Sequence, residues 1–296
     1  MAGSDPQRQT PGTRGRASRW SVLGGTLLGV CLLLAILGFT FLRDDQPADS
    51  HSGGPPVAAA ARTPDTISVS VSGTAAPTTT TTLTALQHAR AESGYLVVEA
   101  ISDPLKIYDR VSPGSVLTRA LPQKGELDVT ATFWAIDEAV DDQDRIWYQV
   151  YLPVRPNGTK GWVKASDVTT SIVTHDVRIH LSEHRLDLYD RGQFVRSYDV
   201  GVGTQDTPTP PGEYFVSIKA KPPNPGTIYG VLVIGISAFS EKLADWPGGG
   251  QVGIHGTNDP STIGTDVSHG CIRLRNEDVL ELSKDAPLGT PVFVED

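Results

Sequence analysis

Cysteine is scarce in this chain, which has only Cys31 and Cys271 among its 296 residues. Cys31 lies inside an uncharged apolar segment and is interpreted as a small apolar filler there. Cys271 is then left without a partner for a disulfide. Cysteines usually pair outside the cytoplasm, so an unpaired thiol in that compartment is a candidate reactive group. A buried, inert cysteine is the alternative interpretation.

Positive charge is also scarce, with 25 Lys and Arg against 34 Asp and Glu, and the formal net charge is −9. It is unevenly placed: residues 1–43 carry five arginines and one aspartate, so the remainder of the chain carries −13. Binding to nucleic acid relies on Lys and Arg to neutralise phosphates. The acidic remainder therefore argues against a nucleic-acid partner.

One long hydrophobic run stands near the N-terminus. Residues 20–42 contain no charged side chain, and 23 residues at about 1.5 Å each can cross a hydrocarbon core of roughly 30 Å. The arginines in residues 1–19 predict a cytoplasmic tail, a retained single-pass anchor in the cell membrane and an extracytoplasmic remainder. A cleaved signal peptide is the alternative, but its apolar region is only about 7–15 residues long.

Few apolar side chains occur between residues 43 and 90, where Ala, Pro, Thr, Ser and Gly dominate. Such a composition cannot offset the conformational entropy of folding, so a disordered linker is predicted. The linker would act as a tether that lifts the folded part off the membrane. A glycosylated stalk has the same composition and stays open as an alternative.

Residues 91–170 show short apolar runs separated by turn formers such as Pro113-Gly114 and Asn157-Gly158. Five strands, and hence a small barrel, are predicted. They are Tyr95–Ala100, Lys106–Tyr108, Glu126–Trp134, Ile146–Leu152 and Gly161–Lys164. The run Trp147–Tyr151, followed by a polar turn and Gly161–Val163, resembles bacterial SH3-like domains of cell-wall proteins. Its aromatic side chains are assigned to the core in preference to a ligand platform.

Residues 171–296 predict a mostly β domain with one helix near the C-terminus. The predicted strands are Val177–Leu181, Arg185–Tyr189, Phe194–Val200, Tyr214–Ile218, Val231–Ile236, Gln251–Ile254 and Pro291–Val294. Asn276 is a suitable N-cap for a helix over Glu277–Ser283, with acidic residues at its positive end. Val279, Leu280 and Leu282 are expected to face inward.

The reactive residues fall in two short segments, Ile254–Thr257 and Ser268–Leu274. A cysteine nucleophile needs a base to form its thiolate, and His255 lies sixteen residues before Cys271. Only a loop could bring this pair together. The backbone amides of Gly270 and Cys271 could donate to a developing oxyanion, which is often the largest catalytic contribution.

Two other interpretations of these residues stay open. His255, His269 and Cys271 could bind zinc, but the chain has no H-E-x-x-H or C-x-x-C motif to complete a ligand set. No metal and no cofactor are therefore expected. The histidines and the thiol could also be buried structural groups, although Gly, Ser, His and Cys are unusually dense here.

At these residues the chain resembles the L,D-transpeptidase (YkuD-type) catalytic domain family of bacterial cell walls. The family carries a histidine, a spacer of variable length and then Ser/Thr-His-Gly-Cys, as in His255 and Ser268–Cys271. The continuation Ile272–Asn276 also matches, and Thr207–Gly212 is similar to a family loop with one extra proline. The resemblance covers roughly residues 172–295 and implies a β-sandwich-like domain that follows the SH3-like barrel.

The resemblance implies a role for each site residue. Cys271 would be the nucleophile and His255 its base, with His269 shaping the site and helping to activate the thiol. Gly256 follows the base, so its backbone carbonyl could orient the imidazole. The bidentate fork of Arg273 suits a peptide carboxylate. Ser268 and Asn276 complete the expected substrate-binding residues.

The implied reaction joins peptidoglycan stem peptides, which serve as donor and acceptor. The thiol attacks the carbonyl between the diamino acid at stem position three and D-alanine at position four. A neighbouring side-chain amine then resolves the thioester and forms a 3→3 cross-link. Water as the acceptor would make the protein a carboxypeptidase, and a non-catalytic wall-binding protein is a further alternative. Carbapenem β-lactams would acylate the same thiol.

Overall fold

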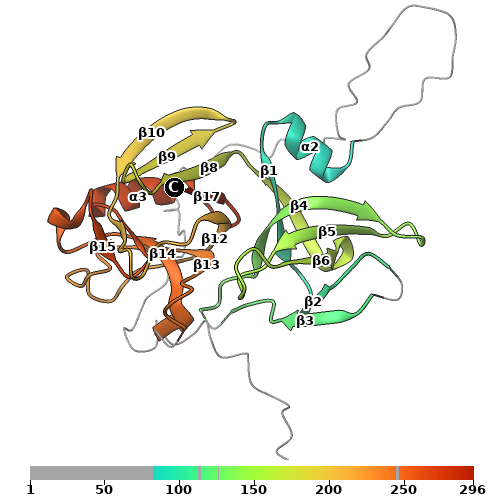
Figure 1. Cartoon of the computed structure of the whole chain (residues 1–296). Helices are drawn as coiled ribbons and strands as arrows, with labels where there is room; N and C mark the ends of the chain where they lie inside the picture. Colours follow the sequence, from blue (N-terminus) through green and yellow to red (C-terminus); the bar gives the residue numbers. More distant parts are fainter. Residues whose placement is uncertain (1–82, 113–114, 126, 245–246) are drawn as a thin grey trace, which may run out of the picture.

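The computed structural model describes residues 83–296, apart from residues 113–114, 126 and 245–246 (Figure 1). The expected basic tail, the apolar segment and most of the tether lie in residues 1–82, outside the described residues. None of the helices within the described ranges is long and apolar enough to cross a membrane. The described chain is mostly β, as predicted, with two α-helices and two large sheets.

The N-terminal sheet has seven antiparallel strands in the order β3-β2-β6-β5-β4-β1-β7. Its strands are β1 (Tyr95–Ala100), β2 (Leu105–Tyr108), β3 (Leu117–Leu121), β4 (Thr132–Val140), β5 (Ile146–Tyr151), β6 (Lys160–Lys164) and β7 (Val168–Val173). Short 3-10 helix η1 (Ala165–Asp167) joins the last two. Sequence analysis placed four of these strands closely and missed β3 and β7.

The strand predicted over Glu126–Trp134 begins later, at Thr132, and continues to Val140. Asp128 has a φ of 56°, and its N–H donates to the carbonyl of Gly125, so the chain turns there instead of extending. A left-handed backbone is tolerated by Asp better than by most residues. Pairing with β1 starts only where Thr132 lies opposite Glu99.

The end of the expected tether is ordered, which corrects the prediction of disorder through residue 90. Helix α2 (Ala85–Ala91) begins with a capping box in which the Thr84 and Gln87 side chains bond each other's backbone amides. Such a box satisfies amide groups that a helix start leaves unpaired. Leu86 and Ala89 are buried against the N-terminal sheet. Two apolar residues three positions apart were too weak a pattern to predict this helix.

The C-terminal sheet has eight strands in the order β10-β9-β8-β17-β12-β13-β14-β16, and β11 pairs separately with β15. Its strands are β8 (His175–His180), β9 (Arg185–Asp190), β10 (Gln193–Asp199), β12 (Gly212–Ala220), β13 (Val233–Phe239), β14 (Gln251–His255), β16 (Ile272–Arg273) and β17 (Pro291–Glu295). The separate pair is β11 (Val202–Gly203) and β15 (Asp266–Ser268), and 3-10 helices η2 (Pro247–Gly250) and η3 (Pro260–Thr262) lie in the loops.

Helix α3 (Asn276–Asp285) confirms the predicted C-terminal helix with two corrections. Arg275 is its N-cap, and Asn276 is already its first helical residue. Val279 and Leu282 are fully buried, but Leu280 is 43% exposed, contrary to the prediction. Successive helical residues point about 100° apart, so Leu280 leaves the face that its neighbours bury.

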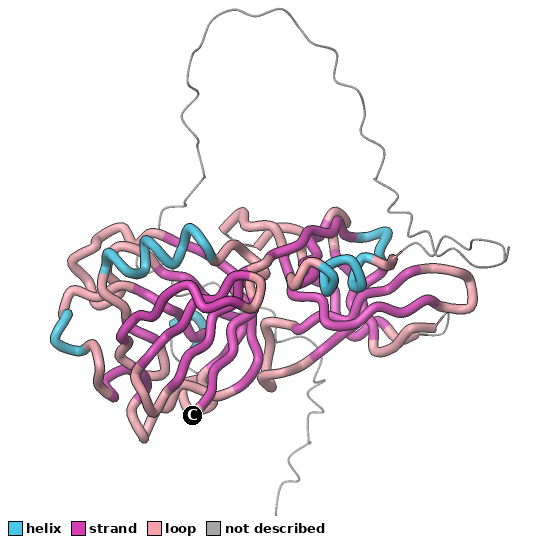
Figure 2. The backbone as a smooth tube through the Cα atoms, turned by 90° about the horizontal axis from the view of Figure 1, so that it is seen from above, coloured by secondary structure: helices cyan, strands magenta, loops and turns pink. Residues whose placement is uncertain are grey.

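The two sheets lie side by side (Figure 2). Apolar side chains pack between them. Phe215 of β12 is buried in the core of the N-terminal sheet, with its ring 6.1 Å from that of Phe133. The Tyr95 hydroxyl of β1 donates to the buried Asp176 of β8 over 2.9 Å. The contact between the sheets is thus both apolar and hydrogen-bonded.

Candidate active site

A parallel strand pair brings the two predicted reactive segments together. Ile254 of β14 lies opposite Ile272 of β16, and His255 lies opposite Arg273. Side chains alternate between the faces of a sheet, so Cys271 and His255 project from the same face. Ile254 and Ile272 project from the other face and are fully buried in the core. The strand register therefore places thiol and imidazole on one side, although a long loop separates them in sequence.

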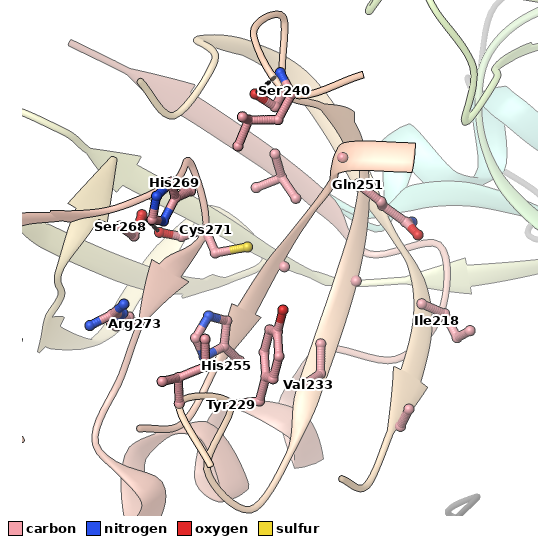
Figure 3. Close-up of a pocket in the computed structure, with 17 residues that line it drawn as sticks. Ile218, Tyr229, Val233, Ser240, Gln251, His255, Ser268, His269, Cys271 and Arg273 are labelled. Atoms are coloured by element: carbon pink, nitrogen blue, oxygen red, sulfur yellow. Dashed lines mark hydrogen bonds between the residues drawn. The ribbon is translucent and has the colours of Figure 1, made fainter. Parts of the chain in front are cut away.

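Cys271 and His255 line the same pocket at the end of this pair (Figure 3). The sulfur of Cys271 points into the pocket, on the side where His255 and Tyr229 stand. Much of the remaining wall is apolar and comes from β12, β13, β14 and the flanking loops. Its apolar residues are Ile218, Ala220, Ile228, Tyr229, Val233, Leu243 and Val252.

The His255 ring is buried, with 3% of the residue exposed. Its Nδ1 lies 2.6 Å from the carbonyl oxygen of Gly256, which can only accept a hydrogen bond. Nδ1 therefore carries the proton of the neutral ring, and Nε2 is left as the basic nitrogen. Tyr229 stacks edge-on against the imidazole at a centroid distance of 5.1 Å.

The electrostatic environment keeps His255 neutral at physiological pH. Its pKa is lowered from 6.5 to about 4, mainly by burial and to a smaller extent by the nearby positive charge of Arg273. The hydrogen bond to Gly256 acts in the opposite direction, raising the pKa, but is outweighed. A neutral imidazole can accept a proton, as a general base must.

Burial also keeps the Cys271 thiol protonated. It raises the pKa of the thiol above its ordinary value of 9. A backbone hydrogen bond from Gly253 and the charge of Arg273 lower this pKa in part. The resting pair therefore consists of a thiol and a neutral imidazole, not of a thiolate and an imidazolium.

The side-chain hydroxyl of Ser268 stabilises the loop that carries Cys271. The Ser268 Oγ donates to the Cys271 carbonyl over 2.5 Å and accepts from the Gly270 N–H over 3.1 Å. Gly270 has a φ of 110°, a left-handed value that favours glycine. The structure thus gives Ser268 a part in shaping the loop. Two amides, those of Gly270 and Cys271, were predicted to donate to an oxyanion. Because the Gly270 N–H already donates to Ser268, the Cys271 N–H is the remaining candidate.

The other expected substrate-binding residues lie in different places. Arg273 lines the pocket beside Cys271 and His255, and its buried Nε has no hydrogen-bond partner. His269 also lines the pocket and is exposed. Asn276 does not line it, in contrast to the expectation. Its Oδ1 accepts from the amides of Val231 and Thr257, both over 3.2 Å, and so ties together the loops beside the imidazole.

Several pocket residues were missed by sequence analysis, above all Tyr229, Ser240 and Gln251. Tyr229 belongs to a turn between strands, and its neighbours carry no motif that points to a site. Ser240 and Gln251 flank a loop after β13 that has no polar pattern of its own. Within the described ranges, no group of three or more His, Cys, Asp or Glu side chains could hold a metal ion.

Comparison with known proteins identifies the family of the C-terminal part of the chain. The family model of the L,D-transpeptidase catalytic domain, YkuD, matches residues 174–294. A putative L,D-transpeptidase YkuD of Bacillus licheniformis is 38% identical over 164 residues, which cover 53% of this chain and 92% of that protein. The corresponding Bacillus subtilis protein is 32% identical over 122 residues, which cover 41% and 66%.

A solved Enterococcus faecium L,D-transpeptidase is also similar, with 26% identity and a TM-score of 0.33. The match covers 41% of this chain and 50% of that chain. The family assignment rests on the sequence relatives, since this chain spans almost all of the Bacillus licheniformis protein. The chain therefore belongs to the L,D-transpeptidase family of the YkuD type.

Proposed function

We propose that the protein is a peptidoglycan L,D-transpeptidase that forms 3→3 cross-links through a thioester on Cys271. The observation that carries the proposal is the placement of Cys271 and His255 on one face of the β14–β16 pair, inside a pocket. The Gly256 carbonyl supports it, because it occupies Nδ1 and leaves Nε2 to act as the base. His269 completes the rim and shapes the entrance for the donor stem.

In the first half-reaction the thiol attacks the carbonyl between stem positions three and four. The thiol proton moves to Nε2 of His255 as the carbon–sulfur bond forms, because both groups are neutral in the resting state. The Cys271 amide stabilises the oxyanion of the tetrahedral intermediate. The carbon–nitrogen bond then breaks, and His255 returns the proton to the amine of the departing D-alanine.

In the second half-reaction the side-chain amine of a neighbouring stem attacks the thioester. His255 takes a proton from the attacking amine and delivers it to the Cys271 sulfur as the carbon–sulfur bond breaks. The new amide links position three of one stem to position three of the other. The largely apolar wall around Cys271 favours this outcome, since it limits the water that could compete with the amine.

Arg273 supports substrate binding because its guanidinium group has an unbonded N–H that a substrate carboxylate could accept from. Its buried Nε lacks a hydrogen bond, and a buried donor without a partner is costly. A carboxylate of the stem peptide would supply that partner and would neutralise the charge beside the reacting groups. A carbapenem carries a carboxylate next to its reactive amide, and attack by the Cys271 thiol on its ring would acylate the enzyme.

The rest of the chain fits a cell-wall location. We place an SH3-like domain at residues 91–170 and the catalytic domain at residues 171–296. The apolar segment 20–42 is proposed as a single-pass anchor with a cytoplasmic N-terminus and an extracytoplasmic enzyme. The linker between residue 43 and the first domain would let the active site reach stems at a distance from the membrane.

Incubating the purified chain with tetrapeptide muropeptides tests the proposal directly, with mass spectrometry as the readout. Cross-linked dimers and free D-alanine are expected, and neither should form with Cys271→Ala. Trimmed tripeptides without dimers would replace transpeptidation by carboxypeptidation. No change with the native chain would overturn catalysis on these stems altogether.

A further inference from the structure

The loop between β5 and β6, residues 152–159, reaches from the N-terminal sheet to the end of β13. The Asn157 side chain forms two hydrogen bonds with the backbone of Phe239. Its Nδ2 donates to the Phe239 carbonyl over 2.8 Å, and its Oδ1 accepts from the Phe239 amide over 2.9 Å. The Asn157 side-chain amide thus pairs with the Phe239 backbone as a neighbouring strand would. On the other side of β13, Phe239 lies opposite Gln251.

Arg155 strengthens the same contact. Its Nη2 donates to the carbonyl of Ser240 over 2.8 Å, and its guanidinium lies 4.9 Å from the centre of the Phe239 ring. A Cβ at Gly250 would lie 3.0 Å from that guanidinium, so the arginine also packs on the segment that leads into β14. Phe239 and Ser240 are therefore held by two side chains of the other sheet.

The held segment is part of the pocket wall. Ser240, Leu243 and Gly250 line the pocket that contains Cys271. The Ser240 amide donates to the Gly250 carbonyl over 2.7 Å, and the Ser240 hydroxyl accepts from the Leu243 amide over 3.3 Å. The position of Ser240 consequently sets the positions of the other two wall residues.

We propose that Asn157 and Arg155 are positioning residues, through which the N-terminal sheet shapes the donor-binding wall of the Cys271 pocket. The identity of the donor rests on the proposed function, whereas the contact itself does not. Other bonds keep the sheets from moving independently, among them the hydrogen bond from Tyr95 to Asp176 and the contact of Phe133 with Phe215. The N-terminal sheet is then a working part of the enzyme and not only a spacer.

The opposite end of the N-terminal sheet offers a matched control. The β4–β5 turn points away from the C-terminal sheet (Figure 1), and Gln143 in this turn is exposed. Gln143→Ala therefore removes a side-chain amide from the same sheet without touching the pocket. Asn157→Ala removes both bonds to Phe239, and Asn157→Asp keeps the acceptor but loses the donor.

Hydrogen exchange in the full-length chain measures the contact without relying on activity. In Asn157→Ala the amides of Phe239 and Ser240 should exchange roughly tenfold faster than in the native chain, since loss of a hydrogen bond promotes local opening. Asn157→Asp should give an intermediate increase. Labelling of Cys271 by a bulky maleimide should rise relative to labelling by iodoacetamide, because a loosened wall admits larger reagents.

Steady-state kinetics measure the consequence for the donor. KM for a tetrapeptide donor should rise roughly five- to tenfold in Asn157→Ala with kcat nearly unchanged, as expected when only binding contacts are lost. The proposal is overturned if exchange, labelling ratio and KM all match those of Gln143→Ala. It is also overturned if the rise in KM is accompanied by a lower kcat and a lower Tm, which indicates general destabilisation. If the native chain has no activity on tetrapeptides, the proposed function fails, and exchange and labelling still decide the positioning role.

Discussion

The Nδ1 of His255 lies 2.6 Å from the carbonyl oxygen of Gly256, the next residue along the chain. A backbone carbonyl thus performs the orienting task that a carboxylate performs in many catalytic triads. A neutral acceptor adds no negative charge, so it favours the imidazolium less than a carboxylate would. Burial then dominates the pKa of His255 and lowers it to about 4.

The acidic limit of activity should therefore lie near pH 4. The proposed mechanism requires neutral His255, and protonation of this ring in the free enzyme would remove the base. We expect kcat/KM for a tetrapeptide donor to stay level from pH 7 down to about pH 5 and to fall near pH 4. A pH series of initial rates with purified chain measures this limb. A fall centred at pH 6.5 would show that the ring is not desolvated in solution.

The same lowered pKa predicts a loss of stability in acid. The unfolded chain binds a proton on this histidine below pH 6.5, whereas the folded chain binds it only near pH 4. Stability from this group is therefore complete above pH 6.5 and declines as pH falls to 4, by roughly 3 kcal/mol in total. Urea unfolding of the native chain and of His255→Gln should show a smaller pH dependence in the variant.

The Cys271 thiol should behave as an unactivated thiol toward a small alkylating agent. Burial holds its pKa above 9, so the thiolate fraction at neutral pH is small. The iodoacetamide rate should still be increasing above pH 9, while acylation by a donor stem already proceeds at pH 7 with the help of His255. A labelling rate that levels off by pH 7 would instead reveal a preformed thiolate–imidazolium pair.

Removing the Ser268 hydroxyl should loosen the loop that holds the thiol. Ser268→Ala leaves the Gly270 amide and the Cys271 carbonyl without their shared partner. A loss of about 1–3 kcal/mol in stability is expected from unmade bonds at a buried position, together with a lower kcat. Ser268→Thr keeps the hydroxyl and should restore most of kcat. Equal defects in both variants would show that the defect does not come from the loss of the hydroxyl.

Two leucines of α3 provide a test of the fold. Leu282 is fully buried and Leu280 is 43% exposed, so their truncation should differ sharply. Leu282→Ala should cost about 2–5 kcal/mol through a cavity in the core. Leu280→Ala should change stability by no more than about 0.5 kcal/mol, as surface substitutions usually do. Denaturant titration of both variants measures the difference, and similar losses would contradict this helix orientation.

The parts of the fold that were predictable are those with a strong local pattern. Strands such as β9 and β10 were placed within one residue, because the Arg191-Gly192 turn signal separates two runs of strand-forming residues. Helix α2 was missed because only Leu86 and Ala89 mark its buried face, and strand β3 was missed because none of its residues is buried. The onset of β4 was missed because the turn continues past Gly125 to Asp128, which adopts a left-handed φ of 56° without being a glycine.

The site was predictable to the extent that chemistry depends on residue type. Cys271 and His255 were predicted from their residue types, and the structure places both in the lining of one pocket. Asn276 was misplaced because its value lies in bonding two loop amides, which no motif records. Residues such as Tyr229 and Asn157 could not be found, since each matters only through a neighbour that lies far away in sequence.

The parallel register of β14 and β16 predicts different effects for insertions and deletions at different places in this chain. The stretch from residue 258 to residue 265 contributes no residue to the pocket and only returns the chain towards β15 and β16, so insertions there should leave the chemistry intact. Deleting one residue between Cys271 and Arg273 is a different matter. The sulfur would then shift to the face occupied by Ile272, in the core and away from the pocket, and even a stably folded chain would lose its nucleophile.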